Sequence, residues 1–269
     1  MHKTYVIGDI HGYYEKLVAN LVSAGLMDDD LYWTGGECAL WFLGDFFDRG
    51  PRGIDVLNLV MHLQAEAADD GGRVSALIGN HEVQLLGAYH FRHQKSTGPG
   101  RTFLADWQRN GGIGNDLARL NVQHVAWLSN LPAMARVGER LLMHADSQVY
   151  THYGDSVEAV NAAIYDLLHS DDTEAWDRIL SQFSAHKTFA THREEGIKRA
   201  LHYLDTYGGR QIVHGHSPIN TVTYKPASSI TEPLVYADGL CINVDGGLYS
   251  GGPGFVYELP PVHELVPVI

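Results

Sequence analysis

The chain has 269 residues, a length at which an α/β fold often forms a single domain. Its 19 Lys and Arg against 32 Asp and Glu give a formal net charge of −13, which argues against a basic surface for nucleic acid or acidic lipid. Apolar residues make up 45% of the chain, no apolar run is long enough to span a bilayer, and two cysteines are too few for a disulfide framework, so we expect a cytoplasmic globular protein without membrane contact.

Short apolar runs alternate with longer amphipathic runs in the first half of the chain. The short runs predict strands, and apolar residues at helical spacing, such as Leu17, Val18 and Leu21, predict helices. This repeated order of strand, loop and helix favours an α/β architecture. The predicted strands are 4–7, 38–43 and 74–78, and the predicted helices are 13–24 and 53–67.

The second half is predicted to be helical before it becomes rich in strands. Residues 88–130 are polar and predicted to be helical, with a break at Gly111–Gly114, and their Tyr and Trp side chains are expected to serve packing. A hairpin, two helices and a further helix are predicted to follow, at 134–143, within 156–183 and around 197–204. The last predicted strands are 211–213, 221–224, 234–236, 241–244 and 255–259.

Five loops hold nearly all the residues typical of catalysis, and each loop follows a predicted strand. Ligands of open α/β sheets bind at the edge outside the carboxyl ends of the strands, where such loops meet. The loops cover residues 8–12, 44–50, 79–82, 143–146 and 213–218.

If these loops converge, they offer carboxylate, amide and imidazole ligands without thiolate. Such a set suits Mn²⁺, Fe or Zn²⁺ better than Ca²⁺ or a structural zinc site. Six ligands are too many for one catalytic ion that keeps an open position, so we expect two ions that share a carboxylate, roughly 3.5–4 Å apart. The candidate ligands are Asp9, His11, Asp45, Asn80, His144 and His216.

Three intact motifs carry a specific resemblance. Gly-Asp-x-His-Gly at 8–12, Gly-Asp-x-x-Asp-Arg-Gly at 44–50 and Gly-Asn-His-Glu at 79–82 are followed by the separate histidines His144 and His216. This series resembles the phosphoprotein phosphatase (PPP) branch of the calcineurin-like metallophosphoesterases, in particular bacterial-type serine/threonine protein phosphatases. The segment from Asn243 to Tyr249 is also similar to the strand and turn near the end of bacterial members.

The resemblance implies a fold and a domain organisation. Its α/β fold consists of two mixed β-sheets that pack as a sandwich flanked by helices. We expect residues 1–269 to form one such metallophosphoesterase domain, with a helical lid or wall at about 155–205.

The resemblance also implies a role for each matching residue. Arg49 matches the arginine that holds phosphate oxygens, His81 the acid that protonates the leaving oxygen, and Asp48 the carboxylate that orients this histidine. The implied reaction is a displacement at phosphorus by a metal-bridging hydroxide, without a covalent phosphoenzyme. Asp9 and His11 match ligands of the first metal, Asp45 the bridging carboxylate, and Asn80, His144 and His216 ligands of the second metal.

Departures from the family pattern leave several roles open. Asp146 stands where the family has glycine, and an extra carboxylate there would alter metal preference or repel anions. A second phosphate-binding arginine is expected between the last two histidine ligands, and Arg178 and Arg193 are both candidates. His214 is a further ligand, a hydrogen-bond donor behind the ligands, or a buried structural histidine.

These features together predict a metal-dependent phosphomonoester hydrolase. The expected cofactors are two divalent ions per chain, with Mn²⁺ first and Fe or Zn²⁺ as alternatives. The first hypothesis for the substrate is a phosphorylated protein, and the second is diadenosine tetraphosphate or another nucleotide or small phosphoester. A non-catalytic metal-binding scaffold is a third hypothesis, which the general acid His81 speaks against because a binding module does not need one.

Overall fold

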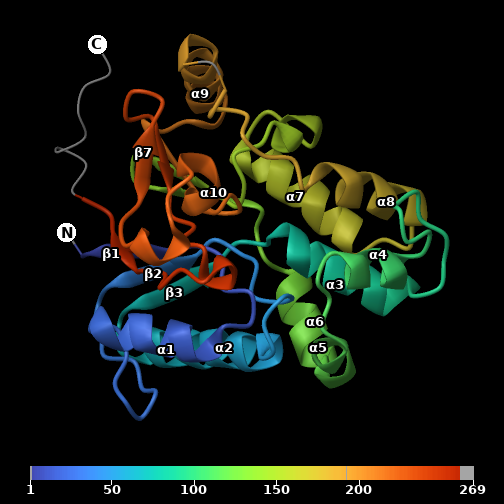
Figure 1. Cartoon of the computed structure of the whole chain (residues 1–269), viewed down its shortest axis with the longest axis horizontal. Coiled ribbons are helices and arrows are strands. Elements are labelled where there is room, and N and C mark those ends of the chain that lie inside the picture. Colours follow the sequence, from blue (N-terminus) through green and yellow to red (C-terminus); the bar gives the residue numbers. More distant parts are fainter. Residues whose placement is uncertain (1, 192, 261–269) are drawn as a thin grey trace.

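Two β-sheets form the centre of the protein and helices cover their outer faces (Figure 1). The computed structural model describes residues 2–191 and 193–260. Each sheet contains parallel and antiparallel pairs, so both sheets are mixed and the predicted fold is confirmed. The first sheet has the strand order β3-β2-β1-β9, with β1 (Thr4–Ile7), β2 (Ala39–Phe42), β3 (Arg73–Ala76) and β9 (Tyr257–Glu258).

The second sheet has the strand order β4-β5-β6-β8-β7. Its strands are β4 (Met134–Val137), β5 (Arg140–Met143), β6 (Gln211–His214), β7 (Leu234–Tyr236) and β8 (Cys241–Asn243). Strands β4 and β5 form the predicted antiparallel hairpin, with Met134 opposite Met143. Strands β5, β6 and β8 run parallel, which brings the residues after their carboxyl ends to one edge.

The predicted strand at 221–224 is wrong, because this segment lies in the short helix α10 (Ile219–Thr223). The run of β-branched residues suggested a strand, but hydroxyl groups satisfy the helix backbone here. The Thr223 hydroxyl donates to the Ile219 carbonyl at 2.7 Å, and the Thr221 hydroxyl donates to the Pro218 carbonyl at 2.8 Å. Tyr224 then ends the helix in a left-handed conformation with φ of 60°.

Apolar side chains of the two sheets pack against one another between them. Val6 and Trp41 come from the first sheet and meet Leu142, Val213 and Ile242 of the second sheet, and all five are buried. This inner layer holds the two sheets in one fixed arrangement, so that the loops after β1, β2, β3, β5 and β6 meet at a common edge.

Helices α1 (Tyr14–Ser23) and α2 (Gly53–Asp69) cover the outer face of the first sheet (Figure 1). A second group of helices lies beside the sheets, where α3, α4, α7 and α8 are neighbours in Figure 1. The remaining helices are α3 (Asn80–Phe91), α4 (Phe103–Arg109), α5 (Gly114–Arg119), α6 (Val122–Ser129), α7 (Val157–Leu168), α8 (Thr173–Gln182) and α9 (Arg193–Tyr207), with 3₁₀ turns at Val149–His152, Ala227–Ser229 and Leu248–Ser250.

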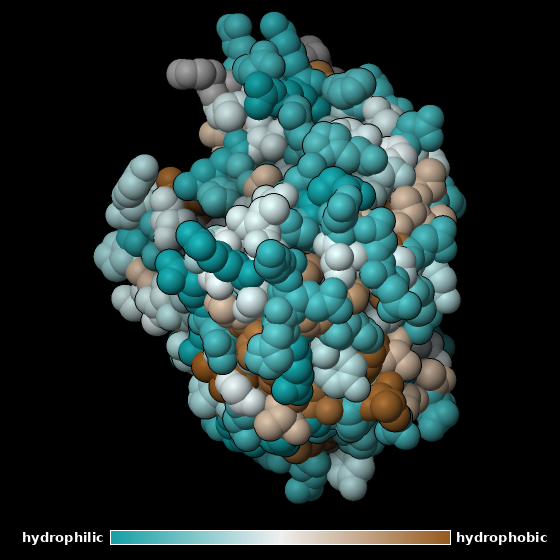
Figure 2. Space-filling view, turned by 90° about the vertical axis from the view of Figure 1, so that its right-hand side faces the viewer, coloured by the Kyte–Doolittle hydropathy of each residue, from teal (hydrophilic) through white to brown (hydrophobic). Residues whose placement is uncertain are grey.

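Seen from the side of these helices, hydrophilic side chains cover most of the surface and apolar ones gather in its lower part (Figure 2). Val122, at the start of α6, is 75% exposed, and single apolar residues of this kind are ordinary on soluble domains. Within 2–191 and 193–260, every helix is too short or too polar to cross a bilayer.

Candidate metal centre

The site forms where tight turns carry polar side chains inward from the strand ends. His11, Asp45, Asp48, Arg49 and His216 all have positive φ angles, between 50° and 69°, which side-chain-bearing residues seldom adopt. Such strain persists only where the surrounding structure over-determines it. The turns are therefore held by the rest of the fold in the conformation that points these side chains at one another.

Glu82 ties two of these turns together. Its buried carboxylate accepts hydrogen bonds from the backbone N–H groups of Asp45, Phe46 and Gly79, at 2.7, 2.8 and 2.8 Å. A Cβ atom on Gly79 would lie only 2.3 Å from Asp45 Oδ1, so glycine is required for this close approach. Glu82 therefore fixes the shape of both loops.

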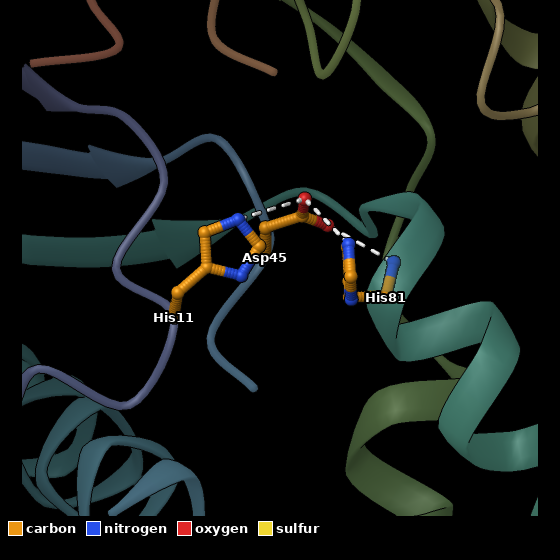
Figure 3. A group of neighbouring side chains, drawn as sticks. All are labelled: His11, Asp45 and His81. Atoms are coloured by element: carbon orange, nitrogen blue, oxygen red, sulfur yellow. Dashed lines mark hydrogen bonds and ion pairs between the residues drawn. The ribbon is translucent and has the colours of Figure 1, made fainter. Parts of the chain in front are cut away.

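One cluster of potential ligands surrounds Asp45 on the side of β1. Donor atoms of His11, Asp45 and His81 lie within 4.8 Å of one another (Figure 3). His11 Nε2 is 3.7 Å from Asp45 Oδ2 and 3.7 Å from Asp9 Oδ2. Because His11 Nδ1 faces the Phe47 carbonyl at 2.8 Å, it carries the hydrogen and leaves the Nε2 lone pair for a cation.

A second cluster lies on the other side of Asp45. Donor atoms of Asp45, His144 and His216 lie within 4.8 Å of one another. His144 Nε2 is 3.4 Å from Asp45 Oδ1, 3.0 Å from Asn80 Oδ1 and 3.1 Å from His216 Nδ1. His144 Nδ1 donates to the Leu43 carbonyl at 2.8 Å, which again leaves the Nε2 lone pair toward the cluster.

These clusters have the electrostatic character of a cation site. Asp9 Oδ2 and Asp245 Oδ2 are buried and have no hydrogen-bond partner among the described residues. Burial raises the pKa of Asp9 and of Asp45 well above their ordinary values, and nearby carboxylates add to this shift. Burial lowers the pKa of His11 and His144, so both imidazoles are neutral and can act as ligands. Buried carboxylates beside neutral imidazoles are a donor set that divalent metal ions fit.

Arg49 lies over the first cluster. Its Nη1 is 2.7 Å from His11 Nε2 and its Nη2 is 3.2 Å from His81 Nε2. The Tyr249 ring covers the guanidinium, with 4.0 Å between the Arg49 Cζ atom and the ring centroid. The sequence assigned no role to Tyr249, although it closes the Asn243–Tyr249 segment that resembles bacterial family members.

His81 and Asp48 form a buried hydrogen-bonded pair. His81 Nδ1 and Asp48 Oδ2 are 2.6 Å apart, and their side chains are 2% and 0% exposed. Burial raises the pKa of Asp48 to about 8, while the hydrogen bond from Trp107 and the charge of Arg49 act in the opposite direction. Burial also lowers the pKa of His81 well below its ordinary value. The structure therefore brings together the two residues that the sequence predicted as a pair.

Asp146 and His214 belong to a separate network behind the clusters. Asp146 Oδ1 accepts from the Phe189 N–H at 2.7 Å, and Oδ2 accepts from the Tyr236 hydroxyl at 2.7 Å. His214 Nε2 is 2.7 Å from the same hydroxyl. Both Asp146 oxygens and His214 Nε2 are therefore engaged in these contacts. Through the bond to the Phe189 N–H, the network holds the loop around Phe189 in place.

A cavity of about 290 Å³ opens above the clusters. Arg49, His81 and His216 line it, together with Lys187 from the segment between α8 and α9. The predicted candidate Arg178 does not line it; its side chain is 62% exposed and pairs with Glu174 at 3.9 Å. The Arg193 side chain lies outside the described residues. Lys187 belongs to no motif, so only its position beside the cavity identifies it. 

Known proteins with similar sequences include phosphatases. The chain is 30% identical over 230 residues to an uncharacterized protein of Schizosaccharomyces pombe, which covers 80% of this chain and 66% of that protein. Shorter matches are to the Shewanella-like protein phosphatase 2 of Arabidopsis thaliana, with 38% identity over 80 residues, and to a symmetrical bis(5'-nucleosyl)-tetraphosphatase of Enterobacter sp., with 37% identity over 86 residues. These matches cover 30% and 32% of this chain and only 20% and 26% of those proteins.

Solved structures share the fold. A cold-active protein-tyrosine phosphatase of a Shewanella species has a TM-score of 0.71 at 22% identity and covers 95% of this chain and 74% of that one. A putative diadenosine tetraphosphatase has a TM-score of 0.53 at 16% identity and covers 96% and 93%. The family model for calcineurin-like phosphoesterases matches residues 2–234. The chain is therefore a member of the calcineurin-like metallophosphoesterases, a family of metal-dependent phosphohydrolases.

Proposed function

We propose that the protein is a phosphomonoester hydrolase that acts on phosphoserine and phosphothreonine in proteins. The observation that carries this proposal is the convergence of three functions in one cavity: two ligand clusters, the Arg49 guanidinium and the His81–Asp48 pair. A scaffold that only holds metal needs the clusters but has no use for a buried histidine–carboxylate pair beside them.

Two divalent ions, with Asp45 as their shared ligand, would supply Lewis-acid stabilisation of the phosphoryl oxygens and lower the pKa of a water molecule. Asp9 and His11 would hold one ion, and Asn80, His144 and His216 the other. Mn²⁺ is the first candidate and Fe or Zn²⁺ are alternatives, because the donor atoms are oxygen and imidazole nitrogen.

The chain's own groups account for binding and proton transfer. Arg49 offers a planar fork of N–H donors to the oxygens of the phosphoryl group, and Tyr249 holds this fork in place. Lys187 provides the second cation at the cavity. As a water oxygen bonds to phosphorus and the bond to the leaving oxygen breaks, His81 Nε2 gives its proton to that oxygen. The Asp48 carboxylate faces Nδ1, where it stabilises the imidazolium that carries the Nε2 proton and holds the ring in the orientation that this transfer requires.

The charges around the cavity support a substrate with a single phosphoryl group. Among the described residues, the Lys and Arg side chains in its lining are those of Arg49 and Lys187. An adjoining cavity of about 230 Å³ shares Gln84 and Asn110 with it and is lined by the carboxylates Asp106 and Asp177. A polyphosphate chain would place several further negative charges near these carboxylates, whereas a phosphorylated side chain on a peptide would not.

We propose the same domain organisation and location as the sequence suggested. The segment between α8 and α9 contributes Ser184, His186 and Lys187 to the cavity, which supports one domain with its wall in the 155–205 region. Both cysteines, Cys38 and Cys241, are unpaired, which supports a reducing, cytoplasmic location.

A substrate comparison tests the proposal. With Mn²⁺, kcat/KM should be higher on phosphoserine and phosphothreonine peptides than on diadenosine tetraphosphate. The opposite order would assign the site to nucleotides, as in the Enterobacter relative, and the absence of turnover on every phosphoester by a folded, metal-loaded protein would refute the hydrolase.

A further inference from the structure

Asp48 uses both of its carboxylate oxygens, and only one of them contacts His81. Asp48 Oδ2 lies 2.6 Å from His81 Nδ1, whereas Oδ1 accepts a hydrogen bond from the Trp107 indole at 2.8 Å. Trp107 lies on α4, 59 residues farther along the chain, and is 1% exposed. A single hydrogen bond would leave the carboxylate free to rotate, whereas one bond on each oxygen fixes its plane.

The segment from Trp107 to Ile113 surrounds the turn that carries Asp48. The Arg49 N–H donates to the Gly111 carbonyl at 2.8 Å, and the Ile113 N–H donates to Asp48. A Cβ atom on Gly112 would lie only 2.4 Å from the Trp107 ring, so the backbone packs directly on the indole. This packing restricts the indole to the orientation in which its N–H points at Asp48.

The burial of the contact makes it energetically significant. Asp48 and Trp107 are 0% and 1% exposed, so water cannot replace a lost donor without entering the core. A hydrogen bond from a neutral donor to a buried charged group is stronger than one between two neutral groups, and a buried carboxylate oxygen that loses its donor loses that stabilisation. The indole N–H is also a donor without acceptor capacity, so the direction of this bond is unambiguous.

We propose that Trp107 is a positioning residue for proton transfer, which fixes Asp48 so that Asp48 in turn aligns His81 with the leaving oxygen. The inference rests on the proposed phosphomonoester hydrolysis and adds a residue that does not line the cavity above the ligand clusters. From the sequence we expected this tryptophan to serve packing only. Packing alone would not require the hydrogen bond to Asp48.

The test depends on how much the leaving group needs a proton. Phenyl phosphate releases a phenol with a pKa of about 10, like that of tyrosine, whereas 4-nitrophenyl phosphate releases a more acidic phenol that departs with little protonation. Trp107→Phe keeps an aromatic ring and removes the N–H. We expect its kcat to fall about 10- to 100-fold on phenyl phosphate and less than about 3-fold on 4-nitrophenyl phosphate, with metal content unchanged.

Two reference variants make the result specific. Trp176→Phe is the matched control, because the Trp176 indole is also fully buried and donates a hydrogen bond, to the Ser170 carbonyl at 3.0 Å, but lies outside the cavity lining. It should reproduce any general loss of stability and leave the ratio of the two rates at its wild-type value. His81→Asn should show the same leaving-group selectivity as Trp107→Phe, with a larger loss.

Each outcome decides one question. If Trp107→Phe loses kcat equally on both substrates, or loses none, the positioning role is overturned. The proposed function would still hold in that case if His81→Asn loses more kcat on phenyl phosphate than on 4-nitrophenyl phosphate. No turnover by the wild-type protein would refute the proposed function itself. If Trp107→Phe fails to fold, replacement of Trp107 by 3-benzothienylalanine, which exchanges the N–H for sulfur in a ring of the same shape, should give the selective loss.

Discussion

The Tyr249 ring lies 4.0 Å from the Arg49 guanidinium carbon and 5.1 Å from the His11 ring centroid. A residue near the end of the chain therefore fixes two residues of the first motifs. Cation–π contacts of this kind contribute about 0.5–2 kcal/mol, depending on how far they are shielded from water.

Removal of the Tyr249 ring should therefore weaken substrate binding through Arg49. We expect Tyr249→Ala to raise KM about 2- to 30-fold, the range that corresponds to the strength of the contact, with a smaller effect on kcat. Tyr249→Phe is the matched control, because it keeps the ring and should stay close to wild type. A wild-type KM in Tyr249→Ala, measured by steady-state kinetics, would show that the ring does not support Arg49.

Asp45 is shared by both ligand clusters. Asp9 Oδ2 faces the first cluster, 3.7 Å from His11 Nε2, whereas Asp9 Oδ1 accepts a hydrogen bond from the His216 backbone N–H at 2.8 Å. Asp45→Asn should therefore lower the affinity for both metal ions, and Asp9→Asn should lower it for one of them. Isothermal titration of the metal-free protein with Mn²⁺ measures this difference without reference to activity.

The control for the titration is Asp116→Asn, which changes a fully buried carboxyl that instead caps the start of α2 through the Ile54 N–H at 3.2 Å. It should leave both binding steps intact. Equal behaviour of Asp9→Asn and Asp45→Asn would contradict the shared role of Asp45.

Buried carboxyl groups make the stability of the metal-free protein depend on pH. Burial raises the pKa of Asp48 to about 8, and the pKa values of Glu82 and Asp245 to about 7. At pH 6.5 the unfolded chain has released these protons and the folded protein still holds them. Stability must therefore fall as pH rises from about 6.5 to 8, by up to about 1.4 kcal/mol per pH unit for each group that stays protonated in the fold.

Buried histidines oppose this trend only weakly. Burial lowers their pKa, that of His216 to about 3, and the unfolded chain keeps about half of their protons at pH 6.5 and loses nearly all of them by pH 8. Each such histidine therefore contributes about 0.4 kcal/mol in the opposite direction over this window. Urea unfolding in EDTA at pH 6.5 and 8 measures the change. A free energy of unfolding that rises toward pH 8 would contradict the assignment of these carboxyl groups as protonated. The decline should be smaller with Mn²⁺ present, because the cations stabilise ionised carboxylates.

Lys187 replaces an arginine as the second cation at the cavity in our proposal. Lys187→Gln should raise KM for phosphopeptides by about 3- to 10-fold, as expected for the loss of one charge-assisted contact that is open to solvent. Arg178→Gln changes an exposed side chain outside the cavity and should match the wild type. If steady-state kinetics instead showed a raised KM in Arg178→Gln and a wild-type KM in Lys187→Gln, Arg178 would be the second phosphate-binding cation.

The sequence predicted the fold well where structure is local. The hairpin of β4 and β5 was predicted with its observed bounds, since two short, mostly apolar runs flank the turn at Gly138-Glu139. The prediction missed the start of α3 at Asn80, because Gly79-Asn80 has the composition of a turn, whereas the Glu82 carboxylate returns to the Gly79 N–H and caps the helix there.

The ligand clusters were predictable because their residues lie in compact motifs. Trp107, Lys187 and Tyr249 were not, because their contacts depend on the packing of distant segments. Trp107, for example, reaches Asp48 only after α4 has docked near α3 and the Gly111–Gly112 backbone has folded over Arg49. A pattern of short motifs contains no information about such tertiary contacts.

The central claim is that this cavity hydrolyses phosphomonoesters with metal and with His81 as the acid. The most direct measurement is the release of inorganic phosphate from phenyl phosphate by the Mn²⁺-loaded protein and by His81→Asn. We predict turnover by the wild type, its loss on EDTA treatment, and a decrease of about 10²- to 10⁴-fold in His81→Asn at unchanged metal content. Wild-type turnover by His81→Asn, or turnover that persists after complete removal of metal, would contradict the account.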